Sequence, residues 1–194
     1  MSRTGRRGVL RTVREDLAAA RRGDPAARGD LENALLYPGL HAVWTHRLTH
    51  RLWIAEGLPG SRFVARLLGQ VARAVTGIEI HPGARIGRRC FIDHGMGVVI
   101  GETAVVGDDV LVFHGVTLGG RGLQHGPGTR RHPVVGDRVV LGAGSSLIGA
   151  ITVGSDSVVG ANTVVTKDVP AGSVVTGVAG TARPRTGHEG VPSL

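Results

Sequence analysis

His94 stands in a loop whose neighbours suit acid–base chemistry. Asp93 precedes it and Gly95 follows it. An imidazole that is neutral near pH 7 suits a general base. Glu79 lies fifteen residues earlier, and a carboxylate in reach of the ring would fix its tautomer. Such a dyad would deprotonate an alcohol or a thiol during acyl transfer. The alternative is a structural or surface role for His94.

A second candidate group follows a long glycine-rich excursion. Arg131 and His132 stand together just before Pro133. A forked guanidinium beside an imidazole suits the binding of a small carboxylate, although a solvent-exposed loop would have the same composition. Asp24 lies between Gly23 and Pro25, and its local sequence favours a turn residue at the end of a helix.

A metal centre is the rival interpretation of the histidines. Four of them, His81, His94, His114 and His132, fall in the repeat region, and zinc takes imidazole ligands. No pair among them has the short spacing of an HxxxH motif. We therefore expect no metal in the reaction.

A six-residue repeat must position these groups. Aliphatic residues return every six positions in three phases, and this period fits neither an amphipathic helix nor an ordinary alternating strand. The positions are Ile80, Ile86 and Ile92; Ile100, Val106, Val112 and Leu118; and Val135, Leu141, Leu147, Val153, Val159 and Val165. We predict a coiled parallel sheet in which three hexads make one triangular coil and the aliphatic side chains point inward. The period alone does not give the handedness.

Glycine often follows the inward residue directly. The set is Gly87, Gly101, Gly107, Gly136, Gly142, Gly154 and Gly160. We expect these glycines to form corners with positive φ angles. The repeat is broken twice, by a slip between Ile92 and Ile100 and by the excursion from Gly119 to Pro133, which includes His125. Since both breaks carry ionisable groups, we expect binding or catalysis there.

Helices are expected before the repeat. Apolar spacing predicts one that ends near Gly23, a second that begins after Pro38, and a third with Ser61 as its N-cap and Gly77 at its end. These helices are too short to bury themselves, so they should pack on the end of the repeat or on a neighbouring subunit. The expected organisation is a flexible basic arm (1–8), an α-helical segment (9–77), a β-helix domain (78–180) with a protruding loop (119–133), and a tail (181–194).

Composition narrows the class of protein. The net charge of +8 raises nucleic acid as a partner, but aromatic residues for base stacking make up only 3% of the chain. A solvated basic arm, or attraction of a polyanionic small ligand, accounts for the charge better. The lone Cys90 allows no internal disulfide. With neither an export signal nor a membrane span in the sequence, we expect a cytoplasmic location and no membrane partner.

Several strings closely resemble those of serine O-acetyltransferases. They span residues 80–87, 91–103, 115–120 and 131–133. The resemblance also includes Asp24 with the two residues after it, and the helix that carries His41 and His50, so that it covers roughly residues 22–180. It therefore extends beyond the generic hexapeptide pattern of many acyltransferases.

The resemblance implies a mainly β fold, a left-handed parallel β-helix of hexapeptide repeats preceded by a small α-helical segment. It implies homotrimers, sometimes paired as dimers of trimers, with active sites between subunits. The implied reaction transfers acetyl from acetyl-CoA to the hydroxyl of L-serine, giving O-acetyl-L-serine for cysteine synthesis. An alternative acceptor is a sugar, homoserine or an antibiotic, and a scaffold that binds ligand without turnover is a further alternative.

Residue roles carry over by position. The resemblance makes His94 the base, places Glu79 where the family has aspartate, and assigns the serine amino group to Asp24 and Asp93. The serine carboxylate and the reacting end fall to Arg131 and His132, and Glu102 matches a position that lines this region.

The resemblance also implies a coenzyme A site and a protein partner. Small residues near the pantetheine arm would be Gly120, Ala143 and Ala161, and the phosphate partners would be Lys167, Arg183 and Arg185. Relatives that dock into cysteine synthase (O-acetylserine sulfhydrylase) usually end in isoleucine, whereas this chain ends in Leu194. Feedback inhibition by cysteine is a further family property.

Overall fold

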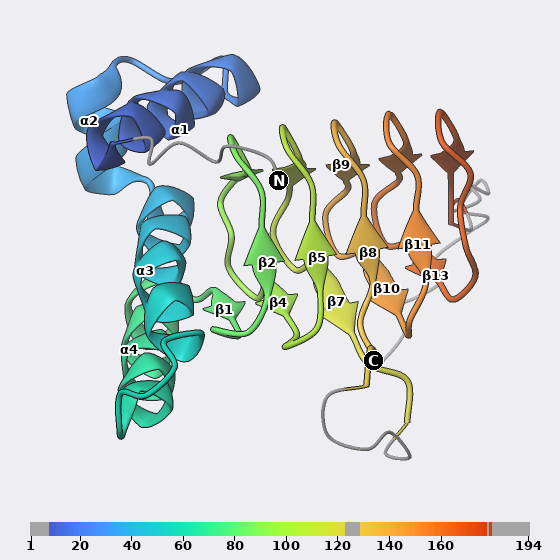
Figure 1. The fold of residues 1–194 in the computed structure, drawn as a ribbon. Coiled ribbons are helices and arrows are strands. Elements are labelled where there is room, and N and C mark those ends of the chain that lie inside the picture. The colour runs from blue at the N-terminus through green and yellow to red at the C-terminus, as the bar shows by residue number, and fades with distance from the viewer. Residues whose placement is uncertain (1–7, 123–128, 178, 180–194) are drawn as a thin grey trace, which may run out of the picture.

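Helices and a three-sided β-helix make up the structure, a computed structural model that describes residues 8–122, 129–177 and 179. The helices cover one end of the β-helix, and the loop 119–133 leaves its side between β7 and β8 (Figure 1). Most of the basic arm, His125 and the tail with Arg183, Arg185 and Leu194 lie outside the described residues.

Among the described residues, four helices precede the strands. They are α1 (Val9–Gly23), α2 (Asp30–Leu36), α3 (Pro38–Trp53) and α4 (Ser61–Thr76). Three predicted boundaries are confirmed: the first predicted helix ends at Gly23, the second starts at Pro38, and the third ends at Gly77. The short α2 was not predicted, because seven residues carry little helical periodicity. The capping prediction for Ser61 was wrong: Gly60 is the N-cap, and Ser61 is the buried first residue of α4.

In the part of the chain that the structure describes, fourteen short strands form three parallel sheets. The first sheet has the order β1-β4-β7-β10-β13, the second β11-β8-β5-β2, and the third β14-β12-β9-β6-β3. The first sheet comprises Glu79–Ile80, Val99–Ile100, Thr117–Gly119, Ser146–Ile148 and Val164–Val165. The second comprises Arg85–Ile86, Val105–Val106, Val134–Val135 and Thr152–Val153. The third comprises Phe91–Ile92, Leu111–Val112, Val140–Leu141, Val158–Val159 and Val174–Val175.

The aliphatic positions of the repeat fill the interior, as predicted. Ile100 pairs in register with Leu118, and Leu118 pairs with Leu147, so each side chain stacks on its counterpart in the next coil. Leu118 and Leu147 are fully buried. Only Ile86, in the first coil, is partly exposed. Burial between neighbouring coils, worth about 25 cal/mol per Å² of apolar surface, is therefore the main stabilising contribution.

The prediction for the repeat glycines was wrong in its physical reason. None of the seven has a positive φ. A Cβ on Gly87 would instead lie 2.3 Å from the carbonyl oxygen of Gly107, and a Cβ on Gly142 would lie 2.6 Å from the backbone nitrogen of Ala161. Because neighbouring coils stack closely, glycine is needed for space. The left-handed conformation falls on other residues, including His94 at φ 56° and Asp109 at φ 58°.

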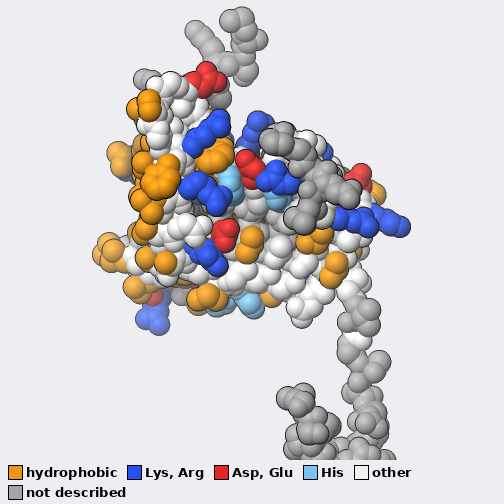
Figure 2. Space-filling view, turned by 90° about the horizontal axis from the view of Figure 1, so that it is seen from below, with side chains coloured by type: hydrophobic (Ala, Val, Ile, Leu, Met, Phe, Trp, Pro, Cys, Tyr) orange, Lys and Arg blue, Asp and Glu red, His pale blue; other side chains and the backbone are white. Residues whose placement is uncertain are grey.

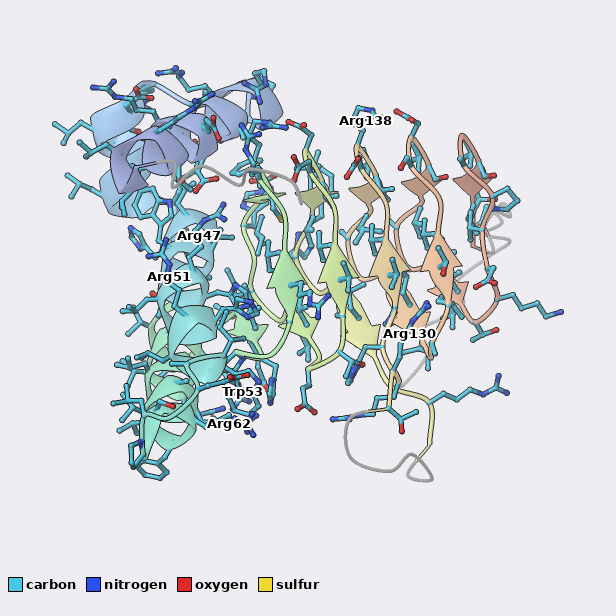
Figure 3. The ribbon with its side chains drawn as sticks, viewed as in Figure 1. Arg47, Arg51, Trp53, Arg62, Arg130 and Arg138 are labelled. Carbon is cyan, nitrogen blue, oxygen red and sulfur yellow. The ribbon has the colours of Figure 1, made fainter. Side chains whose placement is uncertain are left out.

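The helices contact the first coil through polar interactions as well as through apolar packing. The buried carboxylate of Asp16 accepts hydrogen bonds from Trp44 and Arg47 of α3, and Figure 3 shows Arg47 on that helix. Glu15 accepts two hydrogen bonds from Arg88 in the β-helix. The packing of the helices on the end of the repeat, which we predicted because the helices are short, is confirmed. This packing holds the end of α1 in place.

Candidate active site

His94 lies at a corner of the β-helix, in the turn from β3 of the third sheet to β4 of the first. The turn is tight, because the Gly95 nitrogen donates to the Asp93 carbonyl at 2.6 Å, and it places His94 in the left-handed region that histidine tolerates better than most residues. The His94 side chain is 73% exposed, and its Nε2 atom lies 3.8 Å from Oδ2 of Asp93. We call this edge of the three-sided β-helix the His94 corner.

Asp24 approaches the same corner from the end of α1. Its Oδ1 atom accepts a hydrogen bond from the Ala26 nitrogen at 2.7 Å, and its Oδ2 atom accepts one from the Tyr37 hydroxyl at 2.5 Å. These hydrogen bonds, Tyr37 first, lower the pKa of Asp24, and the field of His94 lowers it further. Asp24 therefore stays ionised beside the imidazole, and its turn position does not exclude the amino-group role that the resemblance implies.

Tyr37 is a site residue that sequence reasoning missed. Its ring stacks on Phe91 of β3 with centroids 6.3 Å apart. The hydrogen bond to Asp24, burial, and the charges of Asp24 and Asp93 raise the pKa of Tyr37 to about 12. The phenol thus remains a donor at neutral pH. No spacing rule connects a tyrosine before a helix with an aspartate thirteen residues earlier, so the contact had to come from the tertiary structure.

Arg131 and His132 lie at another corner, between the first and second sheets, where the long loop returns to β8. Thr103, in the coil before, holds both: its Oγ1 atom accepts from the backbone nitrogens of Arg131 at 3.0 Å and His132 at 3.1 Å. The Thr103 nitrogen donates to Nδ1 of His132 at 3.1 Å, which leaves the proton of the neutral ring on Nε2. We call this edge the Arg131 corner.

Charges at the Arg131 corner are tightly coupled. Arg131 Nη2 donates to Glu102 Oε2 at 2.5 Å. Burial raises the pKa of Glu102, but the hydrogen bond from Arg131 and the nearby cations lower it more, so that the net direction is down. His132 is only 8% exposed, and burial followed by the Arg131 charge lowers its pKa. The corner therefore presents a guanidinium and a neutral imidazole, a set suited to a carboxylate ligand.

The two corners are different edges of the same three-sided β-helix. One presents Asp24, Asp93 and His94, and the other presents Glu102, Arg131 and His132. Seen from below, basic, acidic and imidazole side chains gather between the helices and the loop (Figure 2). The structure therefore brings the predicted residues together as two separate groups, the candidate half-sites of this chain.

Glu79 belongs to neither candidate half-site. Its Oε2 atom lies 3.1 Å from Nε of Arg73 in α4. The pair borders a groove that Gly77, Met96 and Val99 also line. Among the described residues, no hydrogen bond joins Glu79 to His94, so the predicted dyad stays a prediction.

The residues assigned to coenzyme A divide between the same two corners. Ala143 and Ala161 lie in successive coils of the His94 corner, where the Asn162 nitrogen donates to the Ala143 carbonyl at 2.8 Å. Gly120 lies at the Arg131 corner, where a Cβ would sit 3.5 Å from the Arg131 carbonyl oxygen. Lys167 is exposed after β13, at the same edge.

The described residues hold neither a candidate metal cluster nor a membrane-spanning helix. No group of three or more His, Cys, Asp or Glu side chains in this part of the chain is arranged to hold a metal ion. None of the described helices has the length and apolarity to cross a membrane.

The chain matches a family of transferases. Residues 132–167 match the family model described as bacterial transferase hexapeptide (six repeats). The coils, their buried aliphatic columns and this match define a transferase of the hexapeptide-repeat class with a left-handed β-helix.

Relatives narrow the class to one family. The chain is 55% identical over 172 residues to a serine acetyltransferase of Mycobacterium tuberculosis, covering 89% of this chain and 72% of the relative. It is 57% identical over 154 residues to a serine acetyltransferase of Helicobacter pylori, covering 79% of this chain and 86% of the relative. The chain belongs to the serine acetyltransferase family.

Solved structures agree with this assignment. Serine acetyltransferase isoform 3 of Entamoeba histolytica, in complex with cysteine, superposes with a TM-score of 0.82 at 39% identity, covering 91% of this chain and 60% of that one. The Neisseria gonorrhoeae enzyme with serine gives 0.79 at 40% identity, over 87% and 66% of the two chains. The Brucella abortus enzyme with coenzyme A gives 0.80 at 40%, over 88% and 65%. The chain thus spans slightly less than two thirds of these solved chains.

Proposed function

We infer that this protein transfers the acetyl group of acetyl-CoA to the hydroxyl of L-serine, giving O-acetyl-L-serine and CoA, the first step of cysteine synthesis from serine. The observation that carries the inference is the half-site at the His94 corner, where an exposed imidazole stands beside two carboxylates. Its occurrence in a chain of the serine acetyltransferase family makes serine the acceptor of choice.

Each half-site matches one part of serine. At the His94 corner the ring would take the hydroxyl proton, while Asp24 and Asp93 would bind the ammonium group. At the Arg131 corner Arg131 and His132 would bind the carboxylate. Holding both ends of a small amino acid aligns its hydroxyl with the base, and such positioning can contribute about 7–11 kcal/mol in favourable cases.

The catalytic role of Glu79 is part of the proposal. Its carboxylate would orient the ring of His94, which requires it to leave Arg73 or to share its oxygens between the two partners. Both side chains of the present pair are partly exposed, and exposed ion pairs are worth about 0–1 kcal/mol. An exchange of partners when substrate binds is therefore inexpensive.

A homotrimer would bring the two half-sites together. The His94 corner of one subunit would face the Arg131 corner of its neighbour and complete the pocket for serine. An exposed apolar stripe on α4 supports burial against another copy, with Phe63 72% and Val75 76% exposed. Pairing of trimers, and docking of the tail into cysteine synthase, remain further proposals.

Coenzyme A would lie along the coils between the two corners. Ala143 and Ala161 would receive the pantetheine arm at the His94 corner, with Gly120 and Lys167 on the facing edge. The reaction requires no metal, since the thioester is already activated. The cytoplasmic location expected from the sequence is part of the proposal. Burial raises the pKa of the Cys90 thiol to about 12, which keeps this thiol unreactive.

A steady-state assay tests the activity. Purified protein with L-serine and acetyl-CoA should release free thiol, and His94→Ala should nearly abolish the release. Unchanged turnover in that variant would reject the mechanism. An acceptor panel of homoserine, a sugar and an aminoglycoside separates the alternatives. A carboxylate-binding Arg131 excludes the sugar and the aminoglycoside, and the turnover of homoserine relative to serine decides between the two amino acids.

A further inference from the structure

His114 lies one coil beyond His94 on the same corner. The two rings meet edge to face, with centroids 5.9 Å apart at 74°. The backbone fixes this relationship: the Gly115 nitrogen donates to the Met96 carbonyl, and the Gly144 nitrogen donates to the His114 carbonyl, both at 2.9 Å. His114 is exposed, so its ring is free to meet a ligand.

The order of residues along this corner gives His114 a place in the reaction. His94 comes first, His114 second, Ala143 third and Ala161 fourth, one per coil. In the proposed function the serine hydroxyl sits at His94 and the pantetheine arm runs past Ala143. The thioester joins these two parts of the reacting complex. It must therefore lie at the level of His114.

The His114 ring also has the right chemistry for this place. Attack on a thioester creates an oxyanion on the carbonyl oxygen, and a preorganised hydrogen-bond donor that meets it lowers the barrier. A neutral imidazole carries one N–H donor. No side-chain hydrogen bond or ion pair engages the His114 ring among the described residues, so this donor is available.

We propose that His114 is a further catalytic residue, which donates its ring N–H to the thioester carbonyl oxygen as that oxygen becomes the oxyanion. This inference rests on the proposed function. The serine oxygen forms a bond to the carbonyl carbon while His94 takes the hydroxyl proton, and the carbonyl π electrons move onto the oxygen bound by His114. When the carbonyl re-forms, the carbon–sulfur bond breaks, and sulfur keeps the electron pair and takes the proton from His94. His114 itself is unchanged.

Two substitutions separate hydrogen-bond donation from packing against His94. His114→Gln keeps an N–H donor and loses the ring, whereas His114→Phe keeps a ring and loses the donor. We expect His114→Phe to lower kcat by about 10²- to 10³-fold, as for other oxyanion donors, and His114→Gln to stay within about tenfold of wild type. KM for both substrates, coenzyme A affinity by calorimetry, and the melting temperature should change little in either variant.

The outcomes are distinguishable. An active His114→Phe would overturn the proposal, because the donor would be dispensable. Loss of kcat in both variants, with coenzyme A affinity unchanged, would also overturn it, because the imidazole itself would then be required. If the wild-type protein releases no thiol with serine, the proposed function fails before either variant is compared.

Discussion

The Tyr37 hydroxyl donates a 2.5 Å hydrogen bond to Oδ2 of Asp24. This contact joins the start of α3 to the end of α1 and aims a carboxylate at the turn that carries His94. The Tyr37 ring also stacks on Phe91 of β3, so this aromatic pair is one of the contacts between the helical segment and the first coil. The placement of Asp24, the proposed ligand of the serine amino group, thus depends on how the helices dock.

Tyr37→Phe should weaken serine binding. The variant keeps the stacked ring but removes the hydrogen bond from the Tyr37 hydroxyl to Asp24, leaving the one from the Ala26 backbone nitrogen. A loss of about 1 kcal/mol corresponds to a rise in the KM for serine of about fivefold, with kcat and the KM for acetyl-CoA nearly unchanged. Steady-state kinetics with each substrate varied checks this, and an unchanged serine KM would remove Tyr37 from the site.

Glu79→Gln and Arg73→Gln test whether Glu79 works on His94 or only pairs with Arg73. If Glu79 orients the base, Glu79→Gln lowers kcat by about 10²-fold or more, while Arg73→Gln, which frees the carboxylate, leaves kcat near wild type. If the carboxylate only forms the ion pair with Arg73, the two variants behave alike. Parallel assays of thiol release with matched melting curves decide between them.

Mixed assemblies test whether neighbouring subunits share the active site. His94→Ala and Arg131→Ala should each be nearly inactive alone. After the two variants are unfolded and refolded together, a trimer with shared sites regains about a quarter of wild-type activity, because some interfaces combine an intact His94 corner with an intact Arg131 corner. Sites confined to one protomer would give no recovery.

Gly101→Ala should damage the Arg131 corner through sterics alone. A Cβ at this position would lie 2.1 Å from Nε2 of His132, and the ring is buried and held by Thr103. Displacement by about 1 Å can cost about 10²-fold, so we expect a large fall in kcat/KM for serine. Gly69→Ala is the control, because its Cβ would meet Pro82 at an ordinary 3.8 Å. Equal kinetics for the two variants would contradict the assigned role of His132.

His46 should make stability depend on pH. Burial, followed by the charge of His50, lowers its pKa from 6.5 to about 4. Between these values the unfolded chain binds more protons, so this contribution to stability is complete above about pH 6.5 and is lost as the pH falls toward 4, by up to about 3 kcal/mol. Urea unfolding at pH 7.5 and pH 5 measures the loss. His46→Gln should reduce it, and an equal loss in the variant would assign the pH dependence to other groups.

The six-residue period determined the β-helix before any contact was known. Each inward aliphatic residue recurs at a covalently fixed interval, so the coils, their three faces and the buried column that contains Leu118 and Leu147 follow from local spacing. The two breaks in the period likewise marked the turn with His94 and the loop that returns through Arg131. These are properties of neighbouring residues along the chain, which sequence records directly.

Contacts between distant segments were decided only by the tertiary structure. Spacing does not tell how α1 and α3 dock, so it could not reveal that Tyr37 holds Asp24 or that Glu79 faces Arg73. Nor could it show that the repeat glycines are required for space between stacked coils, because the distance to the next coil is set by packing. The separation of His94 and Arg131 onto two edges of the β-helix has the same origin. Position along the repeat tells in which coil a residue lies, whereas only the folded structure shows which residues from distant segments lie beside it.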